Sequence, residues 1–339
     1  MLVSWRQIEF MIGMDRRQLQ NLASKAPRFY EPFDVLKRSG NGCRHIDNPT
    51  GLLKDVQGRI MRKILRPVSL PRNMVGGVAG RSVRDNALAH IGQPTLVKLD
   101  LRNHFGRITN DQVFAALRRE LGMSTEIAAV LTQLTTLQHR LPQGAATSTA
   151  LSNLVLLPAH REITRLAADH ACRYTLFVDD ITISGSAARA MIQPTIAVLH
   201  LNGFALAADK LEIVDRCERQ ATTGIVVNRR MTIARQEREA IRREVLQHAA
   251  NPSMSDRDFR SLVGRIRYVA FIDINSGERL AELADRRLPP RVADHLVDRP
   301  HRHLPCRGAH RYRPTPRAAQ NETATVSIDA ATSLPDSFR

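Results

Sequence analysis

The spacing of apolar and polar residues predicts helices in the first third of the chain, with short strand-like pieces between them. Residues 1–28 carry apolar side chains at helical spacing, and Asp15 has the position of a helix N-cap. Turn sequences such as SGNG and NPTG break the next part, residues 29–95, into strand-like pieces. One amphipathic helix, predicted over residues 52–65, interrupts them.

In the middle of the chain, two strand patterns contain acidic residues at an end or a bend. TLVKLD (residues 95–100) is a short apolar run that ends in Asp100. RYTLFVDDITIS (residues 173–184) alternates apolar and polar residues on both sides of Asp179 and Asp180. This alternation predicts a β-hairpin with the two aspartates at its bend.

Helical spacing and further strand-like runs complete this region. We expect Pro158 to kink the longest helix or to break its start, because proline lacks the amide hydrogen that a helix interior uses. A strand pair is expected at residues 204–214 and 222–228. The predicted helices cover residues 111–121, 148–170 and 187–201.

The C-terminal part changes character twice. Residues 229–288 combine dense charge with apolar residues at helical spacing, which predicts a helical bundle. Residues 286–317 hold nine arginines and only two acidic residues, and residues 318–339 are rich in Ala, Thr and Ser. We therefore expect residues 289–339 to form a basic, disordered tail.

Composition narrows the class of protein. The 339 residues are 43% apolar, which is enough for a substantial core and excludes wholesale disorder. Fifty Lys and Arg residues against 33 Asp and Glu give a net charge of +17, which favours a polyanion such as nucleic acid as partner. The four cysteines form no CxxC pair, and no apolar stretch reaches the ~18 residues of a membrane span. We therefore expect a cytoplasmic protein with no membrane partner.

Asp100, Asp179 and Asp180 are the candidates for chemistry. If the strands that carry them are neighbours, three carboxylates converge on one point. Like charges this close repel each other and raise a pKa unless a cation lies between them. Carboxylate oxygens suit Mg²⁺, and three carboxylates could hold two ions ~3.5–4 Å apart. For an isolated pair of aspartates, the alternative is an ordinary polar turn.

The segments around these aspartates resemble bacterial reverse transcriptases, which are RNA-directed DNA polymerases, and they occur in that family's order. The resemblance matches the three aspartates to the metal-binding aspartates of the polymerase palm. It implies two Mg²⁺ ions as cofactors, with Mn²⁺ as a substitute. The matching segments are KLDLRNHFGRIT (98–109), LPQGAATSTALSN (141–153), FVDD (177–180) and a lone lysine, Lys210, after GFALAAD.

Within that family, the chain is most similar to retron enzymes over roughly residues 8–285. The resemblance implies a polymerase that copies a structured non-coding RNA into single-stranded DNA (msDNA). Synthesis would be primed from an RNA 2′-OH, and the product would serve anti-phage defence with an effector protein. The segments that carry this resemblance are NALAH (86–90), similar to an NAxxH element, TTG (222–224), similar to a VTG element, RHIDNPTGLLKDVQGRI (44–60) and LVGRIRYV (262–269).

The resemblance also implies an α+β fold of the right-hand polymerase type, with fingers, a palm that contains a small antiparallel sheet, and a helical thumb. The expected domains are N-terminal helices (1–28), fingers (29–95), palm with inserted finger and helix elements (96–228), thumb (229–288) and tail (289–339).

Further residues take catalytic and substrate-binding roles by the same resemblance. Phe105 would clash with a ribose 2′-OH and so select dNTPs, and Lys210 would protonate the departing pyrophosphate. A core phenylalanine and a solvated strand-edge lysine are the alternatives. The residues expected to bind the incoming nucleotide or template are Gln143, Gly144, Arg44 and Lys54, the last two being ordinary surface charges in the alternative interpretation.

A last group is expected to bind the enzyme's own RNA. Asn86 and His90 are four residues apart and therefore share one helix face. The alternative for His90 is a hydrogen-bonded structural histidine. The expected RNA-binding residues are Asn86, His90, Thr222, Thr223 and Gly224.

The chain departs from its relatives at four positions near the expected site: Phe177, Val178, Ala146 and Thr149 stand where many relatives have Tyr, Ala, Pro and Pro. None of these changes touches the three carboxylates, so we expect activity. Two other functions stay open. One is a different bacterial reverse transcriptase (group II intron-like, diversity-generating or defence-associated), and the other is a catalytically idle RNA-binding protein of the same fold.

Overall fold

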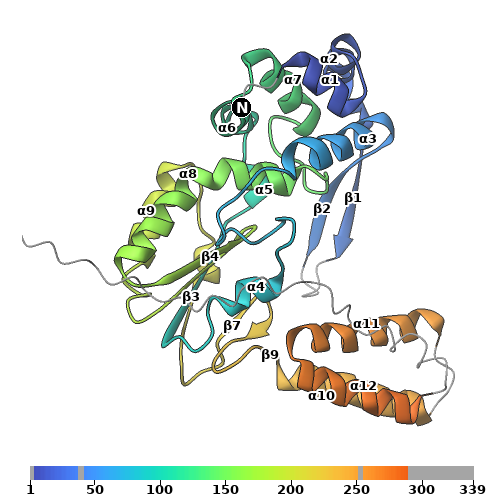
Figure 1. Ribbon diagram of the computed structural model, residues 1–339, viewed down its shortest axis with the longest axis vertical. Helices are drawn as coiled ribbons and strands as arrows, with labels where there is room; N and C mark the ends of the chain where they lie inside the picture. The colour runs from blue at the N-terminus through green and yellow to red at the C-terminus, as the bar shows by residue number, and fades with distance from the viewer. Residues whose placement is uncertain (1–3, 37–41, 251–254, 289–339) are drawn as a thin grey trace, which may run out of the picture. The chain divides into compact units, whose positions relative to one another are not determined.

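Helices and small antiparallel sheets make up the described part of the computed structural model (Figure 1). This mixture confirms the predicted α+β class. The described residues are 4–36, 42–250 and 255–288, and the tail predicted for residues 289–339 lies outside them. Among the described residues, no helix is long and apolar enough to cross a membrane.

Two helices form the N-terminal part, and the second begins where the sequence predicts. Asp15 is the N-cap of the second helix, and its carboxylate accepts a hydrogen bond from the Gln18 amide. The helix predicted over residues 52–65 is also present, with its last turn in π-helical form. The elements are α1 (Trp5–Ile12), α2 (Arg16–Lys25), η1 (Ala26–Phe29), β1 (Tyr30–Leu36), β2 (Cys43–Pro49), α3 (Gly51–Ile60), η2 (Met61–Leu65) and α4 (Val83–Leu88).

A four-stranded antiparallel sheet forms the centre of the described fold, in the order β4-β5-β3-β6. Its middle strands bury apolar side chains such as Leu96, Val97, Ile181 and Ile183. The predicted hairpin is confirmed as β4 and β5. The strands are β3 (Thr95–Asp100), β4 (Arg173–Phe177), β5 (Asp180–Ser184) and β6 (Glu212–Asp215).

Helices pack against this sheet and against each other. The longest, α8, contacts α6, α9 and β4, and its predicted extent is confirmed. The predicted broken start is wrong, because α8 runs through Pro158 as one helix with buried Leu156, Leu157 and Ala159 around the proline. The helices are α5 (His104–Arg107), α6 (Asn110–Leu121), α7 (Thr125–Thr135), α8 (Ser148–Asp169) and α9 (Ile192–Leu201).

Helix α9 begins later than predicted. The sequence predicted a start at residue 187, whereas the helix starts at Ile192 and turns precede it. Pro194 explains the difference. In the first turn its missing amide hydrogen costs nothing, because those amides have no partner within the helix, but an earlier start would place Pro194 in the interior.

The predicted strand pair at residues 204–214 and 222–228 is also wrong in its pairing. Within the first segment only β6 is a strand, and it pairs with β3. Residues 205 and 207 instead hold the chain beside β3, through hydrogen bonds from the Arg102 amide to the Ala205 carbonyl (2.8 Å) and from the Ala207 amide to the Asp100 carbonyl (2.9 Å). The remaining elements are η3 (Ala208–Lys210) and a small sheet of β7 (Ala221–Thr222), β8 (Ile225–Val226) and β9 (Thr232–Ile233).

The helical bundle predicted for residues 229–288 is present as three helices. Their apolar faces form a second core that also includes Ala87 of α4, Leu96 of β3 and Ile225 of β8. The Thr232 hydroxyl donates to the Asp273 carboxylate (2.7 Å), which also caps the last helix. The helices are α10 (Arg235–Ala250), α11 (Asp256–Ile272) and α12 (Ile274–Arg287).

Candidate active site

Three aspartates lie together at one end of the central sheet. Asp100 ends β3 and is the register partner of Asp180, the first residue of β5. The Leu101 amide donates to the Asp179 carbonyl over 3.1 Å, which fixes the hairpin turn beside the end of β3. The strands are therefore neighbours, as the convergence of the three carboxylates requires.

The electrostatics of this cluster show an excess of negative charge. Burial, followed by the charges of Asp179 and Asp100, raises the pKa of Asp180 to about 6. The pKa of Asp179 is also raised, chiefly by burial, with Asp100 adding to the effect. The Lys210 ammonium donates to Asp100 Oδ1 over 2.9 Å, and this hydrogen bond raises the lysine pKa. The charges of Lys210, Lys98 and Arg44 offset the rise in the aspartate pKa values only in part, so the site favours additional cations.

The donor chemistry of the three carboxylates fits Mg²⁺, which prefers oxygen ligands. Within the described ranges, however, no three acidic, histidine or cysteine side chains already surround a common point at which an ion could sit. Asp100 is engaged by Lys210 instead. The residues present therefore fit a divalent ion once the Lys210 contact opens and the carboxylates turn toward each other.

The tip of the hairpin has an unusual backbone. Val178 adopts φ of 62°, which is rare for a β-branched residue. The loop that precedes α4 is hydrogen-bonded to the hairpin. The Val75 amide donates to the Leu176 carbonyl (2.7 Å), and the Leu176 amide donates to the Asn73 carbonyl (2.8 Å). Gly76 in this loop lies directly against the tip. A Cβ placed on it would be 2.6 Å from the Phe177 carbonyl carbon and closer still to the Val178 nitrogen.

Sequence reasoning missed Gly76 as part of the site. Its signal was the glycine pair in VGGVAG, since adjacent glycines mark places where backbone approaches closely. The neighbouring Gly77 has φ of 69° and lies against Thr149 of α8. The loop therefore joins the hairpin to the helix that follows Gln143 and Gly144.

Phe105 lies on the short helix α5, five residues after Asp100. Its side chain is half-buried against the core, and its ring centroid is 5.0 Å from that of His104. His104 is 4% exposed, and neither ring nitrogen has a hydrogen-bond partner, so burial lowers its pKa to about 4. The phenylalanine is thus held at the end of β3 by packing alone.

Gln143 and Gly144 lie beside β2. The Asp47 amide donates to the Gln143 carbonyl over 2.7 Å. Gly144 has φ of 125°, and a Cβ there would be 2.7 Å from Ile46 Cγ2. Arg44, on the same strand, is near enough that its charge partly offsets the rise in the pKa of Asp179.

Lys54 is placed differently. It is exposed in the first turn of α3, and its side chain forms no hydrogen bond or ion pair with another residue in the described part of the chain. The structure brings Arg44, Gln143 and Gly144 into one region through β2, and it shows no contact that adds Lys54 to them.

The expected RNA-binding residues form a buried network. The Asn86 side-chain amide donates to the hydroxyls of Thr222 (3.0 Å) and Thr223 (3.4 Å). His90 hydrogen-bonds Ser184 of β5 (2.7 Å) and Thr175 of β4 (2.8 Å). Asn86 and His90 are fully buried, whereas Thr223 is half-buried and Gly224 is exposed with φ of 82°. The prediction that Asn86 and His90 share one helix face is wrong, because α4 ends at Leu88 and His90 lies in the turn that follows. Asn86 attaches α4 to the turn at Thr223 and Gly224, and His90 attaches the turn after α4 to the sheet.

Acid should destabilise the fold through His90. Burial, aided by the Arg173 charge, lowers its pKa from 6.5 to about 3, so below pH 6.5 the unfolded chain takes up a proton that the folded chain does not. His90 therefore does not reduce the unfolding free energy above pH 6.5, and it reduces it increasingly as the pH falls below that value. We expect His90 to account for about 2 kcal/mol of lost unfolding free energy between pH 7.5 and 5.0.

Urea unfolding at the two pH values measures this loss. The variant His90→Gln should show a smaller difference between pH 7.5 and 5.0 than the wild type, and His200→Gln, at an exposed position, controls for the substitution. An unchanged difference in His90→Gln would contradict the assignment.

The family model and the similar curated proteins agree on one family. The family model for "Reverse transcriptase (RNA-dependent DNA polymerase)" matches residues 35–239. The retron Mx65 reverse transcriptase of Myxococcus xanthus is 32% identical over 83% of this chain and 69% of its own length. The retron Ec86 reverse transcriptase of Escherichia coli is 27% identical over 70% of this chain and 74% of its own length. The retron Se72 reverse transcriptase of Salmonella heidelberg is 26% identical over 54% of this chain and 48% of its own length.

Two solved telomerase structures also match. Apo telomerase from Candida tropicalis, truncated from its C-terminal domain, has a TM-score of 0.47 and 11% identity over 65% of this chain and 61% of that one. Telomerase from Candida albicans with a fragment of telomeric RNA has a TM-score of 0.45 and 10% identity over 86% of this chain and 65% of that one. The chain thus spans less than two thirds of both telomerases and about half of the Salmonella relative.

The family match covers the central sheet, the aspartate cluster and the loop behind it, and the M. xanthus relative extends the likeness over most of the chain. Together they establish that the chain belongs to the reverse transcriptase family, with the right-hand polymerase fold, and that it is an RNA-directed DNA polymerase of the retron type.

Proposed function

We propose that this enzyme copies a structured non-coding RNA into single-stranded DNA, primed from a 2′-OH of that RNA. The observation that carries the proposal is the aspartate cluster, in which Asp100 and Asp180 are register partners and Lys210 contacts Asp100. In each step a hydroxyl oxygen would bond to the α-phosphorus of a dNTP, pyrophosphate would leave, and the hydroxyl proton would be lost.

Asp100, Asp179 and Asp180 are the residues that would hold two Mg²⁺ ions, or Mn²⁺ in their place. When bound, the metal would supply charge neutralisation and a lower pKa for the attacking hydroxyl. The raised pKa values of Asp179 and Asp180 support this role, because burial and the neighbouring carboxylates disfavour their ionised forms, which a bound cation would stabilise. Lys210 would release Asp100 when the carboxylates hold metal, and would then be free to give a proton to pyrophosphate.

The substrate would contact residues around the cluster. Arg44 would meet the triphosphate, and Gln143 and Gly144 would lie against the nucleotide and template strand. Lys54, without a contact to the site among the described residues, would reach the triphosphate only after movement of β2 and α3. This arrangement corresponds to fingers in residues 29–95, a palm in 96–228 and a thumb in 229–288.

Phe105 would select dNTPs by clashing with a ribose 2′-OH. In Phe105→Ala we expect ribonucleotide incorporation, relative to dNTP incorporation, to rise about 10- to 100-fold, since one steric group in a pocket discriminates over that range. Single-nucleotide incorporation with dNTP and rNTP measures the ratio. Phe114→Ala, another half-buried phenylalanine packed on the same core, is the control. Equal ratios in both variants would exclude Phe105 as the selecting residue.

The RNA itself would be recognised partly by the turn at Thr223 and Gly224. Asn86, His90 and Thr222 would act indirectly, because their buried hydrogen bonds hold this turn and α4 against the sheet. The enzyme would work in the cytoplasm, and its RNA-linked DNA would serve anti-phage defence together with an effector protein.

The test uses protein purified from cells that carry the native flanking DNA, beside an Asp179→Ala/Asp180→Ala variant. Bound nucleic acid is extracted and treated with RNase or DNase. A DNase-sensitive band that shortens with RNase and is missing from the variant supports the proposal. RNA without DNA in both preparations would contradict self-primed synthesis.

A further inference from the structure

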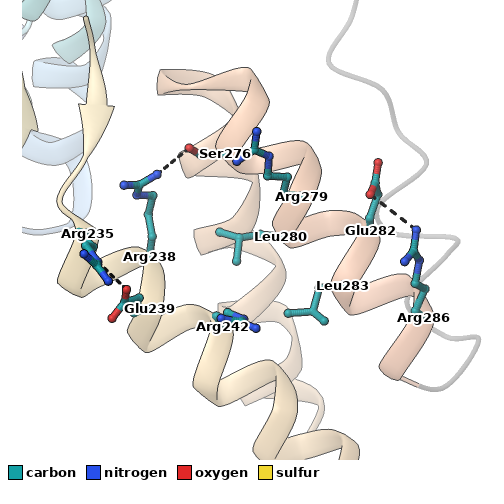
Figure 2. A pocket seen from close by; sticks show the side chains of 10 residues that line it. All are labelled: Arg235, Arg238, Glu239, Arg242, Ser276, Arg279, Leu280, Glu282, Leu283 and Arg286. Atoms are coloured by element: carbon teal, nitrogen blue, oxygen red, sulfur yellow. Dashed lines mark hydrogen bonds and ion pairs between the residues drawn. The ribbon is translucent and has the colours of Figure 1, made fainter. Parts of the chain in front are cut away.

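A groove in the C-terminal helical bundle has no role in the chemistry described above. It lies between α10 and α12 and encloses about 580 Å³ (Figure 2). None of its lining residues belongs to the aspartate cluster or to the surrounding substrate residues. We call it the α10–α12 groove.

Arginine dominates its charge. The lining includes five arginines, no lysine and two glutamates, Glu239 and Glu282, which leaves three net positive charges. Arginine binds planar carboxylate or phosphate groups with two hydrogen bonds at once. The five are Arg235, Arg238, Arg242, Arg279 and Arg286.

Part of this hydrogen-bonding capacity is unused. Arg238 donates to the Ser276 hydroxyl over 2.9 Å, yet its Nε is buried without a partner. The guanidinium groups of Arg242 and Arg279 form no hydrogen bond or ion pair with any other residue in the described part of the chain, and both side chains are exposed. The two glutamates are each paired within one helix, Glu239 with Arg235 and Glu282 with Arg286.

Two leucines and Ser276 complete the lining. Leu280 and Leu283 of α12 lie between the arginines, as Figure 2 shows, and Leu283 is half-buried while Leu280 is 7% exposed. A groove with apolar side chains at its centre and arginines around them is typical of a protein interface. Two adjacent helices of this kind accept a third, amphipathic helix laid between them.

Charge and the apolar lining disfavour two other partners for this groove, a second copy of the chain and a nucleic acid. A second copy of this chain would bring the same arginines against them and repel. A nucleic-acid backbone would gain nothing from the two leucines, and its phosphates would pass close to Glu239 and Glu282. We propose that the α10–α12 groove binds an acidic amphipathic helix of a partner protein, with apolar residues on the two leucines and carboxylates on Arg238, Arg242 and Arg279. This interaction does not depend on RNA-primed DNA synthesis.

The test measures binding of a synthetic 16-residue peptide to the full-length protein by fluorescence anisotropy. The peptide carries Leu at positions i, i+3, i+4 and i+7 and Glu elsewhere, and a scrambled peptide has the same composition without an apolar face. We expect micromolar binding of the first and at least tenfold weaker binding of the second. Equal binding of both peptides would overturn the proposal.

Two charge reversals locate the binding. Arg279→Glu should weaken binding at least tenfold, and a peptide in which a single Glu opposite residue 279 is changed to Lys should recover part of it. Arg287→Glu changes the same charge on the same helix but outside the groove and should have little effect. Equal losses in the two variants, or loss of an RNA hairpin's binding in Arg279→Glu alone, would overturn the proposal. Primer extension by Arg279→Glu confirms folding, and Asp179→Ala/Asp180→Ala should bind the peptide normally.

Discussion

Alanine at Asp179 should lower primer extension on an annealed template by about 10³-fold or more, a loss of about 4 kcal/mol in transition-state stabilisation. The carboxylate lies at the bend between β4 and β5, and the turn that carries it is hydrogen-bonded to the residue after Asp100. Removing it takes away one of the three carboxylates of the aspartate cluster. Steady-state primer extension with Mg²⁺ measures the loss.

Asp179→Ala, which lowers activity, should raise the stability of the metal-free protein. Burial and the charge of Asp100 raise the pKa of Asp179, so the ionised carboxylate opposes folding at neutral pH when no metal is bound. Without this charge, the melting temperature of the metal-free protein should rise. Loss of activity together with higher thermal stability identifies a functional residue, because damage to the fold would lower both.

Asp209→Ala is the matched control. Asp209 is exposed in η3, next to Lys210, and removing its charge leaves the three carboxylates of the aspartate cluster intact. We expect its activity to stay within a few fold of the wild type. If Asp179→Ala extends primers as well as Asp209→Ala does, the aspartate cluster is not the catalytic centre.

The position of the aspartates could be predicted from the sequence because the pattern that carries them is local. Alternation on both sides of Asp179 and Asp180 specifies a hairpin, and an apolar run ending in Asp100 specifies a strand. The local pattern does not show that the two strands lie side by side, and the resemblance to reverse transcriptases provided that information.

Pairing between distant segments could not be predicted in this way. The apolar residues at 204–207 suggested a strand, but Phe204 and Ala207 are buried against other elements while only Glu212–Asp215 pairs with β3. The burial of some polar residues could not be predicted, for a similar reason. Asn86 and His90 have the composition of a binding motif, yet their partners, Thr222 and Ser184, are far away in sequence, so their burial is visible only in the fold.

Alanine at Gly76 should be among the most damaging single-methyl additions to the protein. The new Cβ would lie 2.6 Å from the Phe177 carbonyl carbon and closer to the Val178 nitrogen, and both are backbone atoms that cannot rotate away. The tip of the hairpin would have to shift, and Val178, already at φ of 62°, has little freedom to adapt. We expect a loss of about 3 kcal/mol in unfolding free energy.

Activity should fall further than stability alone explains. The displaced tip carries Asp179 and Asp180, and a misplacement of about 1 Å at a reacting centre can cost about 100-fold in rate. Urea unfolding and primer extension, measured at a temperature where the variant remains folded, separate the two effects.

Gly264→Ala is a control for which we expect the unfolding free energy to rise and not fall. Gly264 is exposed in the middle of α11, its φ is not positive, and a Cβ there meets nothing within 4 Å. Alanine should therefore raise the unfolding free energy by about 0.5–1 kcal/mol through helix propensity. If Gly76→Ala matched Gly264→Ala in stability and activity, the loop behind the hairpin would not hold the aspartates in position. A loss confined to Gly76→Ala would show that the catalytic turn depends on this close backbone contact.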